Sequence, residues 1–308
     1  MKRIYKRLFS GERLSLGRAI LWIVMSTLLI SGSTTLGILY IQHIKALRTQ
    51  DDTYRVIAII QSSPEKETLQ TVYLTELLNL SVDRPMNLYR FDAKEAVQKL
   101  LASPLIKQAA VKKIKPGMLF IDYTMRKPIA YLGDYQNAAV DIEGVVFPFK
   151  PFFTPKTLPE IYLGLNQLSL EEPFEEITWG STITDKRFEL ALTLYRYLIE
   201  EGYGATAVIH QIDVSKAHEP SYGKRQIVLV MEDQLEKEFN GQSYFFSFPR
   251  LIRLNPENYV QGLIQCRTLL NYLQEQELSA SFDANTQFVK AKPKVIDLRI
   301  PQLAYIRD

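Results

Sequence analysis

Two Ser-x-x-Lys strings are the residues of this chain best suited to covalent chemistry, at Ser63–Lys66 and Ser221–Lys224. Cell-wall enzymes use such a serine as the acylated nucleophile, but they also require Ser-Asp-Asn and Lys-Thr-Gly partner motifs. Neither partner motif occurs anywhere in the sequence. We therefore interpret both strings as coincidences in polar loops.

Metal and acid–base chemistry have no better support. The histidines His43, His210 and His218 fall in a polar segment, a predicted strand and a loop, without the i, i+4 spacing that puts two ligands on one helix face. The acidic pairs Glu171-Glu172 and Glu175-Glu176 are typical of a solvated loop. There is no glycine-rich loop that would hold a phosphate. We expect no catalytic residue, no metal, no cofactor and no enzymatic activity.

The composition predicts a folded protein of more than one part. With 308 residues, of which 46% are apolar and 23% charged, the chain suits two folded domains and an appendage. The net charge of +3 is concentrated in residues 1–18, which hold six Lys or Arg against Glu12; elsewhere acidic residues slightly outnumber basic ones. A nucleic-acid function is therefore not expected. The single Cys266 excludes an intramolecular disulfide and is interpreted as a small packed hydrophobe.

Residues 19–41 form an apolar run without a charged side chain. As a helix, these residues span about 34 Å, which is sufficient for a bilayer. The run is longer than the apolar part of a cleaved signal peptide, and no A-x-A-like cleavage site follows it. We predict an uncleaved transmembrane helix. Because the basic residues precede it, residues 1–18 are expected in the cytoplasm and residues 42–308 outside.

The outer region is predicted to contain a stalk and two domains of the α+β class. Residues 42–53 are the stalk, and the first domain covers residues 54–127. Its pattern predicts a strand, a helix, a second helix begun by Asp92, and two strands joined by Lys115-Pro116-Gly117. These elements are expected at 54–61, 69–78, 92–101, 106–114 and 118–125.

The second domain, residues 128–308, is predicted to mix strands with flanking helices. An amphipathic helix is expected at 185–201, stopped by Gly202. The remaining predicted elements are strands at 206–214, 226–232 and 242–248, a helix at 256–276 and a strand at 295–300.

A series of short motifs resembles the FtsQ/DivIB family of bacterial cell-division proteins. In the first domain these are Asn87-Leu88-Tyr89, the helix 92–101, Pro104-Leu105-Ile106, Ala109-Ala110-Val111, Lys113-Ile114-Lys115-Pro116 and Arg126-Lys127-Pro128. In the second they are Asp141 to Phe147, Leu158 to Gly164, and Val295-Ile296-Asp297-Leu298-Arg299. The chain departs from the family at Arg126 and Lys127, where an acidic residue and Arg are usual, in the segment 249–254, and in the insertion-like segment 215–225.

This resemblance implies a POTRA module near the membrane, followed by an FtsQ-type β domain. It implies a non-catalytic scaffold of the divisome in the bacterial inner membrane at the division site. The expected partners are FtsB/FtsL-type proteins, with FtsW/FtsI-type septal wall synthesis proteins as further candidates. In the family, a C-terminal edge strand binds a partner strand by β-augmentation. By position, the expected contacts are Arg299, Ile300, Tyr305 and Ile306.

Two other functions remain open at this stage. One is a POTRA-type polypeptide-handling protein of envelope transport, although such modules usually precede a long membrane barrel. The other is a membrane-anchored cell-wall enzyme, which turnover or labelling by a β-lactam would reveal. For the last predicted strand, Ile296 and Leu298 are expected to face the core, whereas Ile300 can face either the core or a partner.

Overall fold

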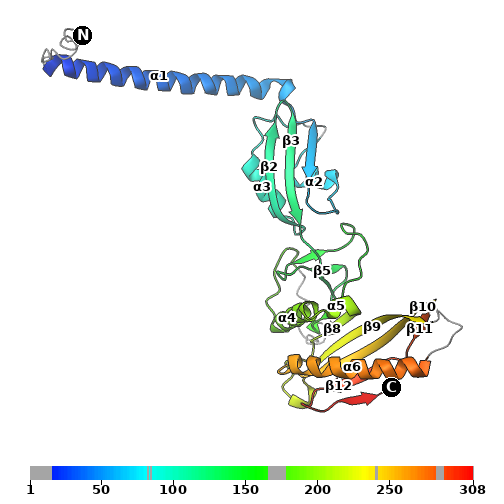
Figure 1. Ribbon diagram of the computed structural model, residues 1–308. Coiled ribbons are helices and arrows are strands. Elements are labelled where there is room, and N and C mark those ends of the chain that lie inside the picture. Colours follow the sequence, from blue (N-terminus) through cyan, green and yellow to red (C-terminus); the bar gives the residue numbers. More distant parts are fainter. Residues whose placement is uncertain are drawn as a thin grey trace, which may run out of the picture.

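The computed structural model of the chain describes residues 16–81, 83, 85–165, 178–239, 242–281 and 288–307. The described part has the mixed α+β class that the sequence predicts. A long helix, a small three-stranded sheet and a larger sheet follow one another along the molecule (Figure 1). Residues 1–15 of the basic tail and the acidic pairs near residue 175 lie outside the described residues.

Helix α1 (Leu16–Gln50) is long and apolar enough to cross a membrane. It contains the predicted span 19–41 and continues beyond it, because residues 42–50 lack Gly and Pro and include good helix formers. The expected stalk is therefore helical over most of its length. A 3₁₀ turn at Asp52–Tyr54 then leads into the first sheet.

Asn87 connects the end of α1 to the first sheet. Its side-chain amide donates to the carbonyl oxygens of Arg48 (3.0 Å) and Asp51 (3.2 Å). At the C-terminal end of a helix such carbonyl oxygens have no N–H partner within the helix. Its Oδ1 accepts a hydrogen bond from the backbone N–H of Tyr89 at 2.8 Å. The Arg48 guanidinium also donates to the Tyr89 hydroxyl at 3.1 Å. The Asn-Leu-aromatic motif thus holds the helix against the outer region.

Replacing Asn87 by alanine should destabilise the first domain by about 1–2 kcal/mol, because the partly buried hydrogen bonds to the backbone of Arg48, Asp51 and Tyr89 are lost. Denaturant unfolding of the detergent-solubilised chain measures the free energy, and faster hydrogen exchange at the Tyr89 amide locates the change. Asn271→Ala, on an exposed face of the last long helix, is the matched control. Equal stability of the two variants would contradict this role for Asn87.

The first sheet has the predicted order of strand, helix, helix, strand and strand. Strand β3 lies in the centre, parallel to β1 and antiparallel to β2. Helices α2 and α3 pack on one face through Leu74 and Leu100 against Leu119 and Ile121. The elements are β1 (Ala58–Ser62), α2 (Thr71–Leu77), α3 (Ala93–Leu101), β2 (Ile106–Ile114) and β3 (Met118–Met125). Strand β1 begins later than the predicted residue 54: residues 52–54 form the 3₁₀ turn, and Arg55 makes only an isolated bridge with Asn87.

The second sheet has ten strands in the described part of the chain. Their order is β13-β12-β10-β9-β8-β7-β4-β5-β6, and β11 pairs with β10 beside this path. The shorter strands are β4 (Ala130–Leu132), β5 (Ala138–Val140), β6 (Val146–Pro148), β7 (Glu160–Tyr162), β11 (Phe288–Lys290), β12 (Lys294–Leu298) and β13 (Tyr305–Arg307). The longer ones are β8 (Ala207–Asp213), β9 (Ile227–Phe239) and β10 (Gln242–Leu254).

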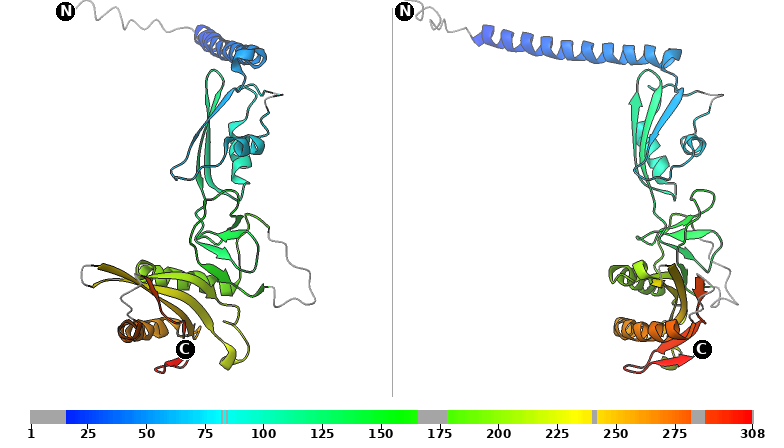
Figure 2. Two further views of the ribbon diagram at one scale, coloured as in Figure 1. Left: turned by 90° about the vertical axis from the view of Figure 1, so that its right-hand side faces the viewer. Right: turned by 45° about the vertical axis from the view of Figure 1, so that its right-hand side comes forward.

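Helices α4 (Lys186–Glu200) and α6 (Tyr259–Ser281) cover one face of this sheet (Figure 2). Asp185 begins α4 by accepting a hydrogen bond from the Arg187 N–H at 2.7 Å. Gly202, with φ +80°, follows the helix in the left-handed conformation that glycine adopts without strain, as the sequence predicts. The short helix α5 (Tyr203–Thr206) then leads into β8.

Strands β9 and β10 are each longer than predicted. The charged residues 233–239 pair with 242–248, and β10 continues through Pro249 to Leu254. Arg250 lies fully buried in this extension, with its Nε 4.0 Å from the carboxylate of Asp233. Arginine is usually exposed, so its presence in the sequence predicts a surface position. A local pattern cannot show that Arg250 is buried beside an acidic residue of the neighbouring strand.

Each outer sheet has a core of its own, but the core of the first sheet also takes in side chains from the start of the second domain. Phe147, Phe149 and Phe153 follow the first sheet in the chain but belong to the cluster built around α2, α3 and β3. On the same side, the rings of Tyr73 on α2 and Phe152 lie 5.1 Å apart. Residues just after the expected boundary at 127 therefore pack on the first sheet, while the rest of the second sheet has a separate core.

Candidate partner-binding edge

Strand β12 is the second strand from one end of the second sheet, between β13 and β10. It pairs with β10 in parallel, from Arg250↔Lys294 to Leu254↔Leu298. Ile296 and Leu298 are buried in the core formed with α6, which confirms the expectation for these two residues. β12 is thus anchored by its side chains as well as by its backbone.

The predicted last strand, 295–300, is not the outermost strand of the sheet. The predicted strand 295–300 ends at Leu298, and β13 turns back to pair antiparallel with its first part: Val295↔Arg307, Ile296↔Ile306 and Asp297↔Tyr305. The sequence Pro301-Gln302 reads as a break, but not as a turn that reverses the chain. Gln302 makes that reversal with φ +64°.

Arg299 is held by groups of its own chain. Its Nε and Nη2 contact the Asp297 carboxylate at 2.9 and 2.7 Å, a bidentate geometry. Its Nη1 donates to the carbonyl oxygen of Gly223 at 3.0 Å, within the insertion-like segment 215–225. Arg299 therefore positions the end of β12 against this segment.

The other three expected contacts are exposed apolar side chains. Ile300 is 62%, Tyr305 68% and Ile306 38% exposed. Leu303, which the sequence reasoning did not single out, is exposed beside them in the chain, and its N–H donates to the Ile300 carbonyl oxygen at 3.2 Å. We call Ile300, Leu303, Tyr305 and Ile306 the edge patch. The signal that would have found Leu303 is the apolar character of the run from 303 to 306.

The pairing of Asp297 with Arg299 predicts a pH dependence at this edge. Burial acts to raise the pKa of Asp297, but the guanidinium and backbone N–H of Arg299 outweigh it and hold the pKa below the usual aspartate value. Because its pKa is lower in the folded than in the unfolded chain, ionised Asp297 stabilises the fold above the unfolded pKa of about 4. This stabilisation is lost as the pH falls through the folded pKa. Acid unfolding of Asp297→Asn should lack this part of the pH dependence. If Asp297→Asn and the unaltered chain showed the same dependence of stability on acid pH, this role of the Asp297–Arg299 pair would be contradicted.

A histidine, a carboxylate and a serine come together on strands β8, β9 and β10. His210 lies 3.5 Å from Glu232, and the Ser247 hydroxyl donates to the same carboxylate at 2.7 Å. The carboxylate thus stands between serine and histidine, whereas serine catalysis places the imidazole between serine and acid. Among the described residues no three metal-ligating side chains come together.

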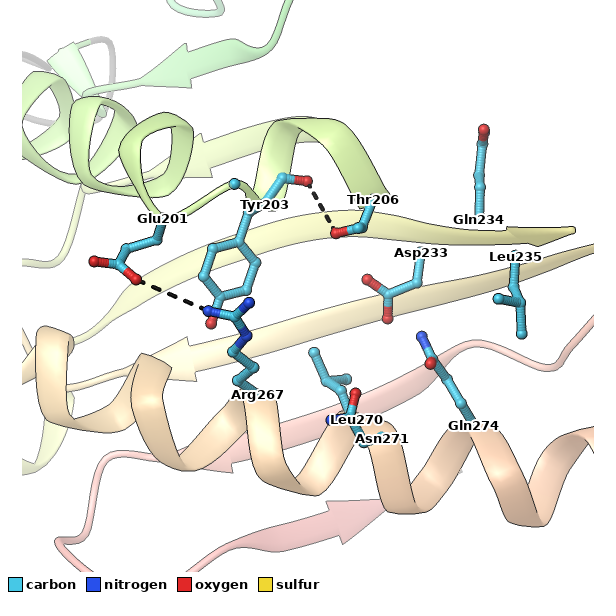
Figure 3. A pocket seen from close by; sticks show the side chains of 11 residues that line it. Glu201, Tyr203, Thr206, Asp233, Gln234, Leu235, Arg267, Leu270, Asn271 and Gln274 are labelled. Atoms are coloured by element: carbon cyan, nitrogen blue, oxygen red, sulfur yellow. Dashed lines mark hydrogen bonds and ion pairs between the residues drawn. The ribbon is translucent and has the colours of Figure 1, made fainter.

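A pocket of about 330 Å³ lies between α5, β9 and α6 (Figure 3). Glu201 and Arg267 face each other at its mouth, 3.8 Å apart. The Tyr203 hydroxyl donates to the Leu263 carbonyl oxygen at 2.9 Å, and burial raises its pKa above the usual value. Glu201 and Arg267 thus pair with each other, and the Tyr203 hydroxyl is engaged by the main chain of α6.

No family model matches the chain, and no curated protein matches it either.

Proposed function

We propose that this chain is a single-pass membrane protein of the bacterial divisome, similar to the FtsQ/DivIB family, that acts as a non-catalytic scaffold. In this proposal α1 anchors it in the inner membrane at the division site. The basic residues before α1, and Asp51 and Asp52 after it, favour a cytoplasmic N-terminus and an extracytoplasmic outer region.

The first sheet supports a POTRA assignment. Its order β1-α2-α3-β2-β3, its central β3 and its position directly after α1 are those expected for such a module. The packing of Phe147, Phe149 and Phe153 in the core of the first sheet would keep this module fixed to the β domain, as a scaffold between two recruitment surfaces requires.

The observation that carries the proposal is the edge patch. Four apolar side chains remain in solvent on and beside the outermost strand of the sheet, and an exposed edge strand is a template for a further strand. An FtsB/FtsL-type partner would hydrogen-bond to this edge and cover the patch. Ile300, Tyr305 and Ile306 would contact the partner, and Arg299 would hold the edge in position.

Co-purification tests this function. The membrane-extracted chain should capture FtsB/FtsL-type proteins of its own organism, and Ile300→Glu and Tyr305→Glu should each reduce capture about tenfold or more. Phe288→Glu is the matched control, because Phe288 is equally exposed on β11, away from β13. Capture by all variants alike would move the interface elsewhere. No capture by the unaltered chain would overturn the partner assignment.

A further inference from the structure

The end of the first sheet beside α1 carries a group of basic side chains. Arg48 lies in the last turn of α1, and Lys113 and Lys115 are exposed at the end of β2 and in the turn that follows it. The Arg48 guanidinium carbon and Lys115 Nζ lie 5.6 and 5.9 Å from the centroid of the Tyr89 ring. Lys113 Nζ lies 5.9 Å from the centroid of the Phe91 ring. We call Arg48, Lys113 and Lys115 the basic cluster.

Neighbouring acidic residues do not neutralise the basic cluster. Among the residues that the structure describes, none of its three side chains is ion-paired with a carboxylate. Asp51 accepts hydrogen bonds from Thr53, and Asp52 pairs with Arg55 at 2.6 Å. Asp92 lies close enough to Lys113 for its pKa to be lowered, but its side chain caps the start of α3. Cations that rest on aromatic rings keep N–H donors for a further anion.

Helix α1 determines the height of the basic cluster above a membrane. The apolar run ends at Ile41, and Arg48 follows about 10 Å further along the helix. Lipid headgroups fill about 5–8 Å beyond the hydrocarbon on each side, and a long basic side chain reaches across the remaining gap. Tyr54 and Tyr89, with ring centroids 5.0 Å apart, suit this interface, where tyrosine is enriched. The cluster therefore lies at headgroup height.

The direction of α1 turns the same side of the first sheet toward the bilayer. Figure 1 shows β2 and α3 on the side of the sheet that lies toward the N-terminal end of α1. When α1 crosses the membrane, this side faces the lipid surface. Lys112, Lys113, Ile114 and Lys115 are exposed at the end of β2 and in the turn after it, so the facing surface is basic with one apolar side chain.

We propose that the basic cluster binds the phosphate groups of anionic phospholipids and holds the first sheet on the membrane surface. The inference rests on the part of the proposed function in which α1 spans the membrane, and not on a partner at the edge patch. An anionic lipid surface attracts basic residues beside a membrane helix, and this attraction is confined to the first Debye length. The cluster satisfies both conditions. The lipid contact orients the outer region as well as anchoring it.

Fluorescence quenching in the full chain tests the contact. Ile114→Cys places one reactive thiol between the two lysines, because Cys266 is buried and burial raises its pKa to about 12. The labelled chain is reconstituted into vesicles that hold a lipid with a spin-labelled headgroup. Quenching should be about threefold stronger with phosphatidylglycerol in the vesicles than with phosphatidylcholine alone. High salt should remove the difference.

Charge variants show whether the basic cluster causes the quenching. Lys113→Glu with Lys115→Glu should abolish the effect of phosphatidylglycerol, whereas Lys113→Arg with Lys115→Arg should keep it. Lys216→Glu with Lys224→Glu is the matched control, since these lysines are exposed in the second domain, and it should also keep the effect. Circular dichroism checks the fold of each variant. Equal quenching in both kinds of vesicle, or no loss in the folded glutamate variant, would overturn the proposal.

Two further measurements separate this inference from the proposed function. Release of the chain from vesicles by alkaline extraction would overturn both the membrane anchor and the lipid contact. An anchored chain that captures its partners but shows no effect of phosphatidylglycerol would overturn the lipid contact alone. A glutamate variant that keeps the quenching but loses partner capture would assign the cluster to a protein and likewise overturn it. Lipid-dependent quenching without partner capture would support the lipid contact and reject the partner.

Discussion

Replacing Arg126 by alanine should lower the free energy of unfolding of the outer region by about 3–5 kcal/mol, the usual cost of removing one partner from a buried ion pair. Arg126 follows β3, and its Nη1 donates to Asp141 Oδ2 at 2.7 Å and to Glu143 Oε2 at 3.2 Å. The Arg126 side chain is 17% exposed and that of Asp141 only 4%. The substitution would leave the Asp141 carboxylate buried without its cation.

This ion pair also joins the two sheets, because Asp141 belongs to the hairpin between β5 and β6. Asp141 Oδ1 accepts hydrogen bonds from the Glu143 and Val145 N–H groups, so the same residue shapes the hairpin and pairs with the first sheet. Asp141→Asn should keep most of the turn but lose the charge. Its cost should therefore approach that of Arg126→Ala.

Lys127→Ala provides the matched control for Arg126→Ala. Lys127 is the next residue and pairs with Glu65 at 2.8 Å, but its side chain is 72% exposed. Exposed pairs contribute about 0–1 kcal/mol. Denaturant unfolding of the three variants in detergent gives the comparison. If Arg126→Ala costs no more than Lys127→Ala, the pair does not link the sheets.

Replacing Phe147 by alanine should cost about 3–5 kcal/mol, through lost apolar burial and the cavity left behind. Phe147 is fully buried, and its ring lies 5.6 Å from that of Phe153. Because both belong to the cluster of α2, α3 and β3, the loss should destabilise the first sheet as well as the hairpin. Hydrogen exchange should therefore quicken at Leu119 and Ile121 of β3, although these residues lie outside the hairpin.

Phe245→Ala removes the same side chain from an exposed position on β10 and should change stability by about 0.5 kcal/mol or less. Exchange at β3 should not respond to it. The packing of Phe147 in the core of the first sheet would be contradicted if Phe147→Ala accelerated exchange only within the second sheet and left β3 protected.

Local patterns in the sequence were enough for several elements. The apolar run 19–41 lies within α1, since a span of this length needs no tertiary partner to be recognised. Strands 106–114 and 118–125 match β2 and β3 residue for residue, because alternation and a Pro-Gly turn are short-range signals. Asp185 and Gly202 likewise bound α4, because caps act on the adjacent turn. The expected absence of an active site rests on motifs and stays a prediction.

Long-range pairing decided the rest. Three features depend on a residue from another strand or hairpin: the charged half of β9, the buried Arg250, and the ion pair between Arg126 and Asp141. The spacing of apolar residues along one segment does not reveal such partners. At the candidate edge, the sequence placed Ile296 and Leu298 in the core correctly but did not show that a further strand pairs beside the predicted strand 295–300. Whether a strand is an edge depends on which segment pairs beside it, and here residues 305–307 return to cover β12. The sequence of a strand therefore predicts which of its side chains face the core. Whether its backbone N–H and C=O groups are free to bind a partner is decided by the tertiary structure.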